Sequence, residues 1–189
     1  FYDTGPRSFY SSNKPIRNVS DLKGMKVRVQ STDILGDLLR TIGAIPRPIP
    51  LGMVYNSLKS DAVDAAEFDL LTYENLRHYE VAKFYSVTEH SMAPSVLVFS
   101  KKIWDRLSKE DQIIIGIAAK ESVPYMRKLW DEYEPTARKA VEAAGAQINT
   151  DTDKKSFSDA LVPGYAKFVT DPNLKNMVEK IKVSDLASA

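Results

Sequence analysis

The stretch DLKGMKVRVQ, residues 21–30, decides how the first half of the chain folds. It predicts one helical turn capped by Ser20, a stop at Gly24 and then a short strand. Apolar and polar residues alternate after the glycine, which is the period-two pattern of a strand with one buried face. Arg28 lies on this strand, where its planar guanidinium would suit two-point contact with a carboxylate. An exposed arginine or a local ion pair is the commoner explanation for such a residue.

Helices and strands alternate outward from this stretch through the first hundred residues, a pattern that favours an α/β sheet. An apolar stripe predicts a helix over residues 33–42. Prolines at alternate positions 46, 48 and 50 suit an extended edge strand whose missing N–H groups all point the same way. The remaining elements expected here are helices over 53–60 and near 72–79, and a buried strand over 95–100.

The sequence of the second half of the chain predicts mostly helices that pack against one another. A long helical region opens at Ser108, which resembles the start of a capping box, and ends at Gly145. Pro124 and Pro135 should kink or divide this region, because each removes a helical hydrogen bond and clashes with the preceding turn. The last elements expected are a strand at 146–149 and helices near 154–169 and 173–182.

Composition narrows the class of protein. At 43% hydrophobic and 27% charged residues, the 189-residue chain resembles an ordinary globular protein. Lys and Arg, 26 in all, nearly balance 25 Asp and Glu, and no basic stripe with interleaved aromatics occurs, so we expect no nucleic-acid binding. No apolar run approaches the roughly 18 residues that span a bilayer. The absence of cysteine excludes disulfides, thiolate catalysis and Cys-ligated metals.

Catalytic motifs are missing from the sequence. His78 and His90 are the only histidines, and although each lies near a carboxylate, they lack the spacing of metal ligands. Structural or surface roles are therefore favoured for both. There is no Gly-x-Ser-x-Gly elbow, glycine-rich dinucleotide motif or P-loop. We expect no enzyme activity, no cofactor and no metal.

Several ordered blocks resemble one family. YDTGPRSFY at 2–10, the stretch at 21–30, HYEVAK at 78–83 and TEHSMAP at 88–94 are similar to the solute-binding proteins of tripartite ATP-independent periplasmic (TRAP) transporters. The similarity runs through nearly the whole chain and is closest to the branch associated with sugar acids. It implies a periplasmic-binding-protein-like α/β fold, a two-lobed clamp that closes over an organic anion. It also implies a periplasmic location and delivery of the ligand to membrane permease subunits.

The resemblance assigns roles to residues of the cleft. Arg28 has the position of the family's main carboxylate clamp and Arg7 that of a second cationic contact, while Glu67 would orient a nearby group or support Arg28. Phe68 departs from the pattern, because an asparagine usually bonds the ligand there. A polar ligand group facing Phe68 would lose its partner, at about 1–3 kcal/mol, so the ligand is less polar there or binding has weakened or vanished. The residues expected to shape an apolar wall are Leu51, Met53, Phe68 and Tyr55, with core packing equally open for Met53 and Phe68.

The resemblance also suggests how the chain divides. Residues 10–88 would form a complete second lobe carrying Arg28, whereas 1–9 and 89–189 would supply hinge strands, the long helix and a partial first lobe. Family members carry a further segment before Phe1, and we expect a signal peptide in the precursor. An incomplete lobe exposes apolar surface and so favours homo-oligomers. Two hypotheses follow: a TRAP solute-binding protein for a carboxylate, or a ligand-free relative that acts as an oligomeric scaffold.

Overall fold

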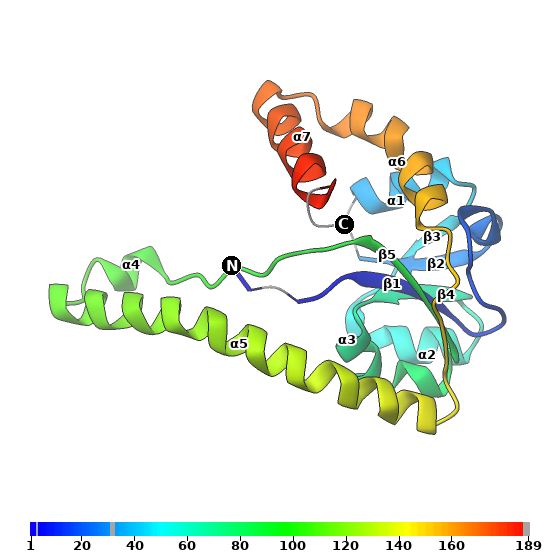
Figure 1. Ribbon diagram of the computed structural model, residues 1–189, viewed down its shortest axis with the longest axis horizontal. Coiled ribbons are helices and arrows are strands. Elements are labelled where there is room, and N and C mark those ends of the chain that lie inside the picture. The colour runs from blue at the N-terminus through cyan, green and yellow to red at the C-terminus, as the bar shows by residue number, and fades with distance from the viewer. Residues whose placement is uncertain (3, 31–32, 187–189) are drawn as a thin grey trace.

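A six-stranded mixed sheet forms the centre of the molecule (Figure 1). The computed structural model describes residues 1–2, 4–30 and 33–186. The sheet order is β3-β2-β4-β1-β5-β6. Strand β2 runs parallel to β3 and β4, β1 is antiparallel to β4 and β5, and β6 is parallel to β5. The strands are β1 (Arg7–Ser11), β2 (Lys26–Val29), β3 (Ile45–Pro48), β4 (Ala65–Phe68), β5 (Phe84–Ser91) and β6 (Gln147–Asn149). The α/β sheet expected from the sequence is confirmed.

Helices cover both faces of the sheet and bury two apolar clusters. On one face, α1 (Asp33–Thr41) packs against α6 (Lys154–Phe168). On the other, α2 (Val54–Lys59), α3 (Leu70–Asn75) and the end of α5 (Lys109–Ala143) enclose the second cluster. Thus β6 and α6, from the second half of the chain, join the same sheet as β1–β5. The remaining helices are α4 (Lys101–Trp104), α7 (Pro172–Leu186) and 3-10 turns at Val19–Leu22, Leu51–Met53 and His78–Glu80.

The stretch at 21–30 folds much as expected, with two corrections. Gly24 takes the left-handed conformation, with φ of 78°. The turn before it is capped by Asn18 rather than Ser20, because the Asn18 side chain accepts the backbone N–H of Ser20 while the Asp21 side chain accepts that of Asn18. The expectation of one buried face is also wrong. Strand β2 lies between two strands and under cover on both faces, so Arg28 is as buried as its apolar neighbours.

The proline-rich strand β3 lies at the edge of the sheet, as its sequence predicts. The backbone N–H groups of Ile45 and Ile49 donate to carbonyl oxygens of Met25 and Val29. The backbone N–H groups of β3 that point toward β2 therefore belong to odd-numbered residues. The prolines at 46 and 48 occupy the positions that face away from β2, so their missing N–H groups leave the pairing with β2 intact.

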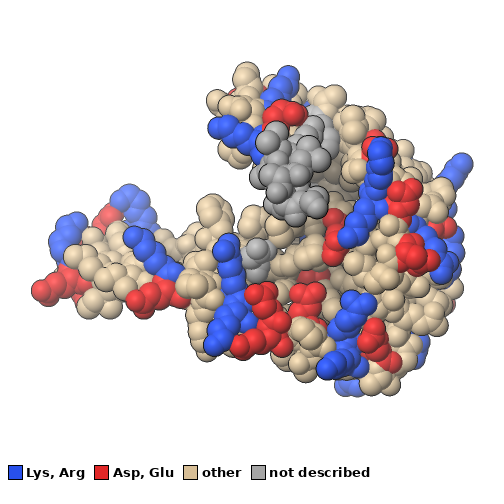
Figure 2. Space-filling view, in the orientation of Figure 1, with Lys and Arg blue, Asp and Glu red and all other residues tan. Residues whose placement is uncertain are grey.

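Helix α5 is continuous over 35 residues, so Pro124 and Pro135 do not divide it, and the other expected effect, a kink, stays a prediction. Each proline removes one backbone hydrogen bond, but the turns on either side remain helical. The C-terminal part of α5 packs on α3 and buries Ala137 and Val141, whereas its N-terminal part extends with α4 as an arm beside the body (Figure 1). Positive and negative side chains alternate along this arm and over the visible body (Figure 2).

The buried strand predicted over residues 95–100 does not form. Within this run only Ser95 pairs, in an isolated bridge to Tyr2. Side chains from Val96 to Phe99 are between 50% and 78% exposed, because no described strand lies beside this apolar run to pair with it. Among the described residues, no helix combines the length and the hydrophobicity needed to cross a membrane.

Candidate ligand-binding site

Arg28 brings a buried guanidinium to the middle of the sheet. The residue is only 1% exposed, and its Nε donates a 2.9 Å hydrogen bond to the carbonyl oxygen of Ile49, just beyond β3. Its Nη1 is buried and has no hydrogen-bond partner among the described residues. Burial lowers the pKa of the Arg28 guanidinium because desolvation disfavours the charged form. Arg28 thus holds an unused donor on a cation that lacks a bonded carboxylate in the described part of the chain.

Arg7, at the start of β1, is paired with a carboxylate instead. Its Nε and Nη2 contact the two carboxylate oxygens of Glu67 at 2.5 and 2.8 Å, and Nη2 also donates to the Glu67 carbonyl oxygen at 3.1 Å. Burial disfavours the charge on Arg7, but the hydrogen bonds and the charge of Glu67 outweigh it and raise the pKa of Arg7. Glu67, whose side chain is fully buried, therefore neutralises Arg7 and reaches Arg28 only at longer range.

Phe68 lies against both guanidinium groups. The Cζ atoms of Arg7 and Arg28 lie 4.4 and 5.0 Å from the centre of its ring. Strand β4 runs between β1 and β2, so the two arginines reach this ring from the strands on either side. Phe68 is 5% exposed and belongs to the core cluster beneath the sheet. The sequence left core packing and pocket lining open for Phe68, and the structure shows a core residue that also contacts both cations.

Two neutral histidines border the arginines. Nδ1 of His78 lies 2.7 Å from the Tyr10 hydroxyl, and burial, with a smaller contribution from Arg28, lowers the pKa of His78 to about 4. His90 stacks on Phe9, and burial, followed by the charge of Arg7, lowers the pKa of His90 to about 3. Nε2 of His90 is buried without a hydrogen-bond partner in the described chain, 3.9 Å from Glu67 Oε2.

The other residues predicted for the ligand wall lie outside this cluster. Leu51 and Met53, in the turn that follows β3, are 44% and 58% exposed. The hydroxyl of Tyr55 donates to the Glu80 carboxylate at 2.8 Å. The structure thus brings together Arg7, Arg28, Glu67 and Phe68. Sequence reasoning missed the Tyr10–His78 pair, because the two residues are 68 positions apart and no local pattern relates them.

An apolar cavity of about 410 Å³ adjoins the cluster at Phe9 and His90. Helices α1 and α6 supply most of its walls, with contributions from the chain that leads into α7. His90 therefore borders mainly apolar side chains on this side. Their exclusion of water disfavours the protonated ring and contributes to the lowered pKa of His90.

Comparison with known proteins identifies the family to which the chain is similar. Residues 1–171 match the family described as bacterial extracellular solute-binding protein, family 7. A solute-binding protein of Chromohalobacter salexigens is 35% identical over 96% of this chain and 54% of its own length. The 2,3-diketo-L-gulonate-binding periplasmic protein YiaO of Escherichia coli is 34% identical over 85% of this chain and 49% of its own. The chain thus spans about half the length of these curated relatives.

Solved structures of TRAP periplasmic solute-binding proteins share the fold. One from Bradyrhizobium sp. BTAi1, in complex with galacturonate, has a TM-score of 0.89 and 53% identity, and the match covers 95% of this chain and 60% of that one. One from C. salexigens with bound D-glucuronate has a TM-score of 0.91 and 35% identity, with the same coverage. The partial coverage agrees with the partial fold expected from the sequence. The chain belongs to family 7 of the bacterial extracellular solute-binding proteins, the solute-binding proteins of TRAP transporters.

Proposed function

We propose that this chain forms the anion-binding part of a periplasmic TRAP component that captures a sugar acid, of the uronate type, and delivers it to membrane permease subunits. The observation that carries the proposal is the buried Arg28 guanidinium, whose Nη1 has no partner among the described residues. The uronates bound by the Bradyrhizobium and Chromohalobacter proteins support the ligand class.

Arg28 is the anchor for the ligand carboxylate. A buried cation without a counter-ion is unfavourable, and an incoming carboxylate supplies both the missing charge and the missing acceptor. Charge-assisted hydrogen bonds in such a water-poor site resist solvent competition better than exposed ones. Arg7 has a different role, because Glu67 already occupies its guanidinium. It is a second cationic contact at the edge of the site, held beside Phe68 with its charge largely balanced by Glu67.

The remaining assignments follow the same proposal. Residues 10–88 provide most of the second lobe, to which β6 and α6 are added, and 1–9 with the rest of 89–189 provide hinge strands and part of the first. Leu51, Met53 and Tyr55, beyond the Ile49 carbonyl that holds Arg28, are available to line the entrance to the site. A ligand that binds the closed arrangement more tightly shifts the equilibrium toward it, and the permease would recognise that form. The relatives named above give no support to the alternative of a ligand-free scaffold.

Calorimetric titration with D-galacturonate and D-galactose tests the function directly. The two sugars differ at the carboxylate, so they isolate the interaction assigned to Arg28. We expect saturable binding of galacturonate or glucuronate and no measurable binding of galactose. Equal binding of the neutral sugar, or no binding of any uronate or aldonate by the full-length protein, would contradict the proposal.

A further inference from the structure

Phe68 is the only described side chain whose ring lies under two guanidinium groups. It reaches them from the central strand β4, between the strands that carry Arg7 and Arg28. The ring is itself fixed in place. Phe68 is 5% exposed, its backbone pairs with Ser8 of β1, and its carbonyl oxygen accepts a 3.1 Å hydrogen bond from the buried hydroxyl of Tyr85.

The position of Arg28 requires an explanation, since three features oppose its charge. The guanidinium is buried, its Nη1 lacks a hydrogen-bond partner, and the nearby Arg7 repels it. The hydrogen bond from Nε to Ile49 and the more distant negative charge of Glu67 compensate only in part, because burial still lowers the pKa of Arg28. The negative potential over an aromatic face attracts a guanidinium, and the attraction is stronger where water is excluded. The ring of Phe68 is the described group that supplies this attraction to Arg28 and to Arg7 alike.

An aromatic ring and a polar side chain differ in whether they occupy the N–H donors of a neighbouring guanidinium. An amide oxygen beside Arg28 would accept one of its N–H groups and so compete with the carboxylate of a ligand. The face of an aromatic ring attracts the cation through its negative potential and offers no oxygen or nitrogen acceptor, so it does not compete with a carboxylate for the N–H donors as an amide oxygen would. This difference agrees with the observation that Nη1 of Arg28 keeps an unused donor.

We infer that Phe68 is a positioning residue for anion binding: its ring holds Arg28 charged and oriented while leaving the donors of the guanidinium free for the ligand carboxylate. The inference rests on the proposed function for its ligand, but the interaction between the ring and the cation exists without ligand. It gives Phe68 a role that neither its hydrophobicity nor its burial alone would give.

The first test alters the ring electronically while preserving its shape. Site-specific incorporation of mono-, di- and trifluorinated phenylalanine at position 68 weakens the negative potential over the ring step by step. We expect the Kd for D-galacturonate to rise with each fluorine, to about tenfold overall. The same series at Phe157, a buried ring that has no cation over it in the described structure, is the control and should leave Kd unchanged. A flat series at position 68 would overturn the inference.

The second test needs no ligand. A double-mutant cycle combines Phe68→Leu with Arg28→Met, and urea unfolding gives the equilibrium constant of each variant. We expect Phe68→Leu to lower the folded-to-unfolded ratio about tenfold more when Arg28 is present than when it is absent. Equal effects in both backgrounds would overturn the inference. If the wild-type protein bound no sugar acid, the proposed function would fail, and this cycle would still decide the role of Phe68.

Discussion

Replacing Arg28 by methionine should have opposite effects on stability and on binding. Methionine has a similar length and fits an apolar environment. Removing the buried cation relieves a desolvation penalty of several kcal/mol. Against this stand about 1 kcal/mol for the lost hydrogen bond to Ile49 and about 1 kcal/mol for the contact with Phe68. We expect the ligand-free variant to be more stable by about 1–2 kcal/mol, which for a chain of this size is roughly 2–8 °C in Tm.

Binding should change in the other direction. Two charge-assisted hydrogen bonds to a carboxylate contribute about 3 kcal/mol or more, so Arg28→Met should weaken uronate binding at least about 100-fold. At a ligand concentration of about 100 times the wild-type Kd, the wild-type protein gains about 2.7 kcal/mol, or roughly 5–10 °C. The variant at the same concentration gains about 0.4 kcal/mol, which is roughly 1 °C.

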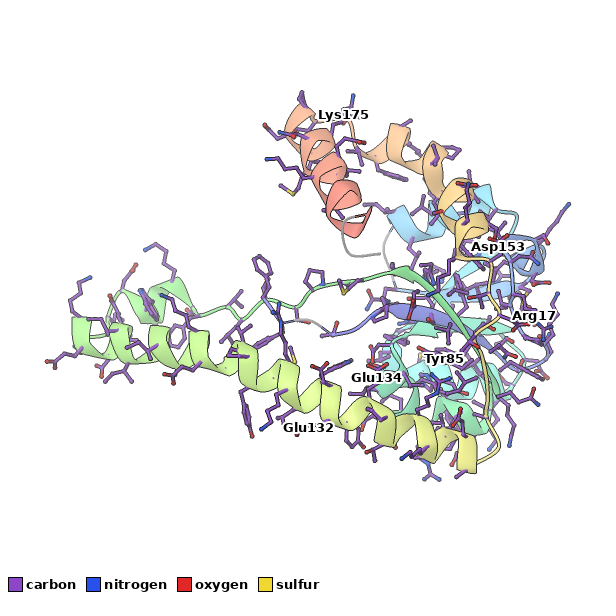
Figure 3. The ribbon with its side chains drawn as sticks, in the orientation of Figure 1. Arg17, Tyr85, Glu132, Glu134, Asp153 and Lys175 are labelled. Atoms are coloured by element: carbon purple, nitrogen blue, oxygen red, sulfur yellow. The ribbon has the colours of Figure 1, made fainter. Side chains whose placement is uncertain are left out.

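Scanning calorimetry with and without D-galacturonate measures both effects in one experiment. Arg17→Met is the matched control, because Arg17 lies at the surface of the body away from the α5 arm, with its side chain 52% exposed and paired with Asp151 (Figure 3). That variant should stay within about 0.5 kcal/mol of wild type and bind normally. The reasoning would be refuted if Arg28→Met lowered the Tm of the ligand-free protein, or if it kept the full shift with galacturonate.

Three further outcomes are expected. Glu67→Gln leaves the partly buried guanidinium of Arg7 without its counter-ion, so urea unfolding should show a loss of about 3 kcal/mol, and a loss below about 1 kcal/mol would contradict the pairing. The pKa values of His78 and His90, about 4 and about 3, lie below the ordinary 6.5, so the unfolded state binds more protons once the pH falls below 6.5. Stability should therefore decrease as the pH falls from 6.5 toward 4, by up to about 1.4 kcal/mol per pH unit for each histidine, and His90→Gln should reduce that slope in urea titrations. Ile114→Ser, at a position 63% exposed on α5, should change the free energy of unfolding by less than about 0.5 kcal/mol, and a larger loss would show that this face of α5 is covered in solution.

Local patterns in the sequence were enough to predict the strand that carries Arg28. The left-handed Gly24 and the buried Val27 and Val29 follow from glycine chemistry and period-two alternation. The sheet class follows from the alternation of elements. The resemblance to TRAP solute-binding proteins, quoted from blocks along the whole chain, is confirmed by the family match and by the solved structures.

What the sequence could not show depends on contacts between distant residues. Strand β4 is adjacent to both β1 and β2, and Glu67 pairs with Arg7 of β1 rather than with Arg28 of β2, a relation that no local pattern encodes. The run at 95–100 has the composition of a strand, but composition does not supply the partner that a strand needs. The position of Phe68 under two cations likewise depends on the order β2-β4-β1. Residues assigned to the ligand by resemblance remain predictions until binding is measured.

The prolines of β3 have a consequence for self-association. An exposed sheet edge can serve as a template onto which a strand of another molecule adds, and such growth is a route to fibrils. At the outer side of β3, Pro46 and Pro48 remove the backbone donors that an incoming strand would need. This side of the sheet is thereby closed to extension by foreign chains, and replacing both prolines with valine would create an aggregation hazard without touching the core.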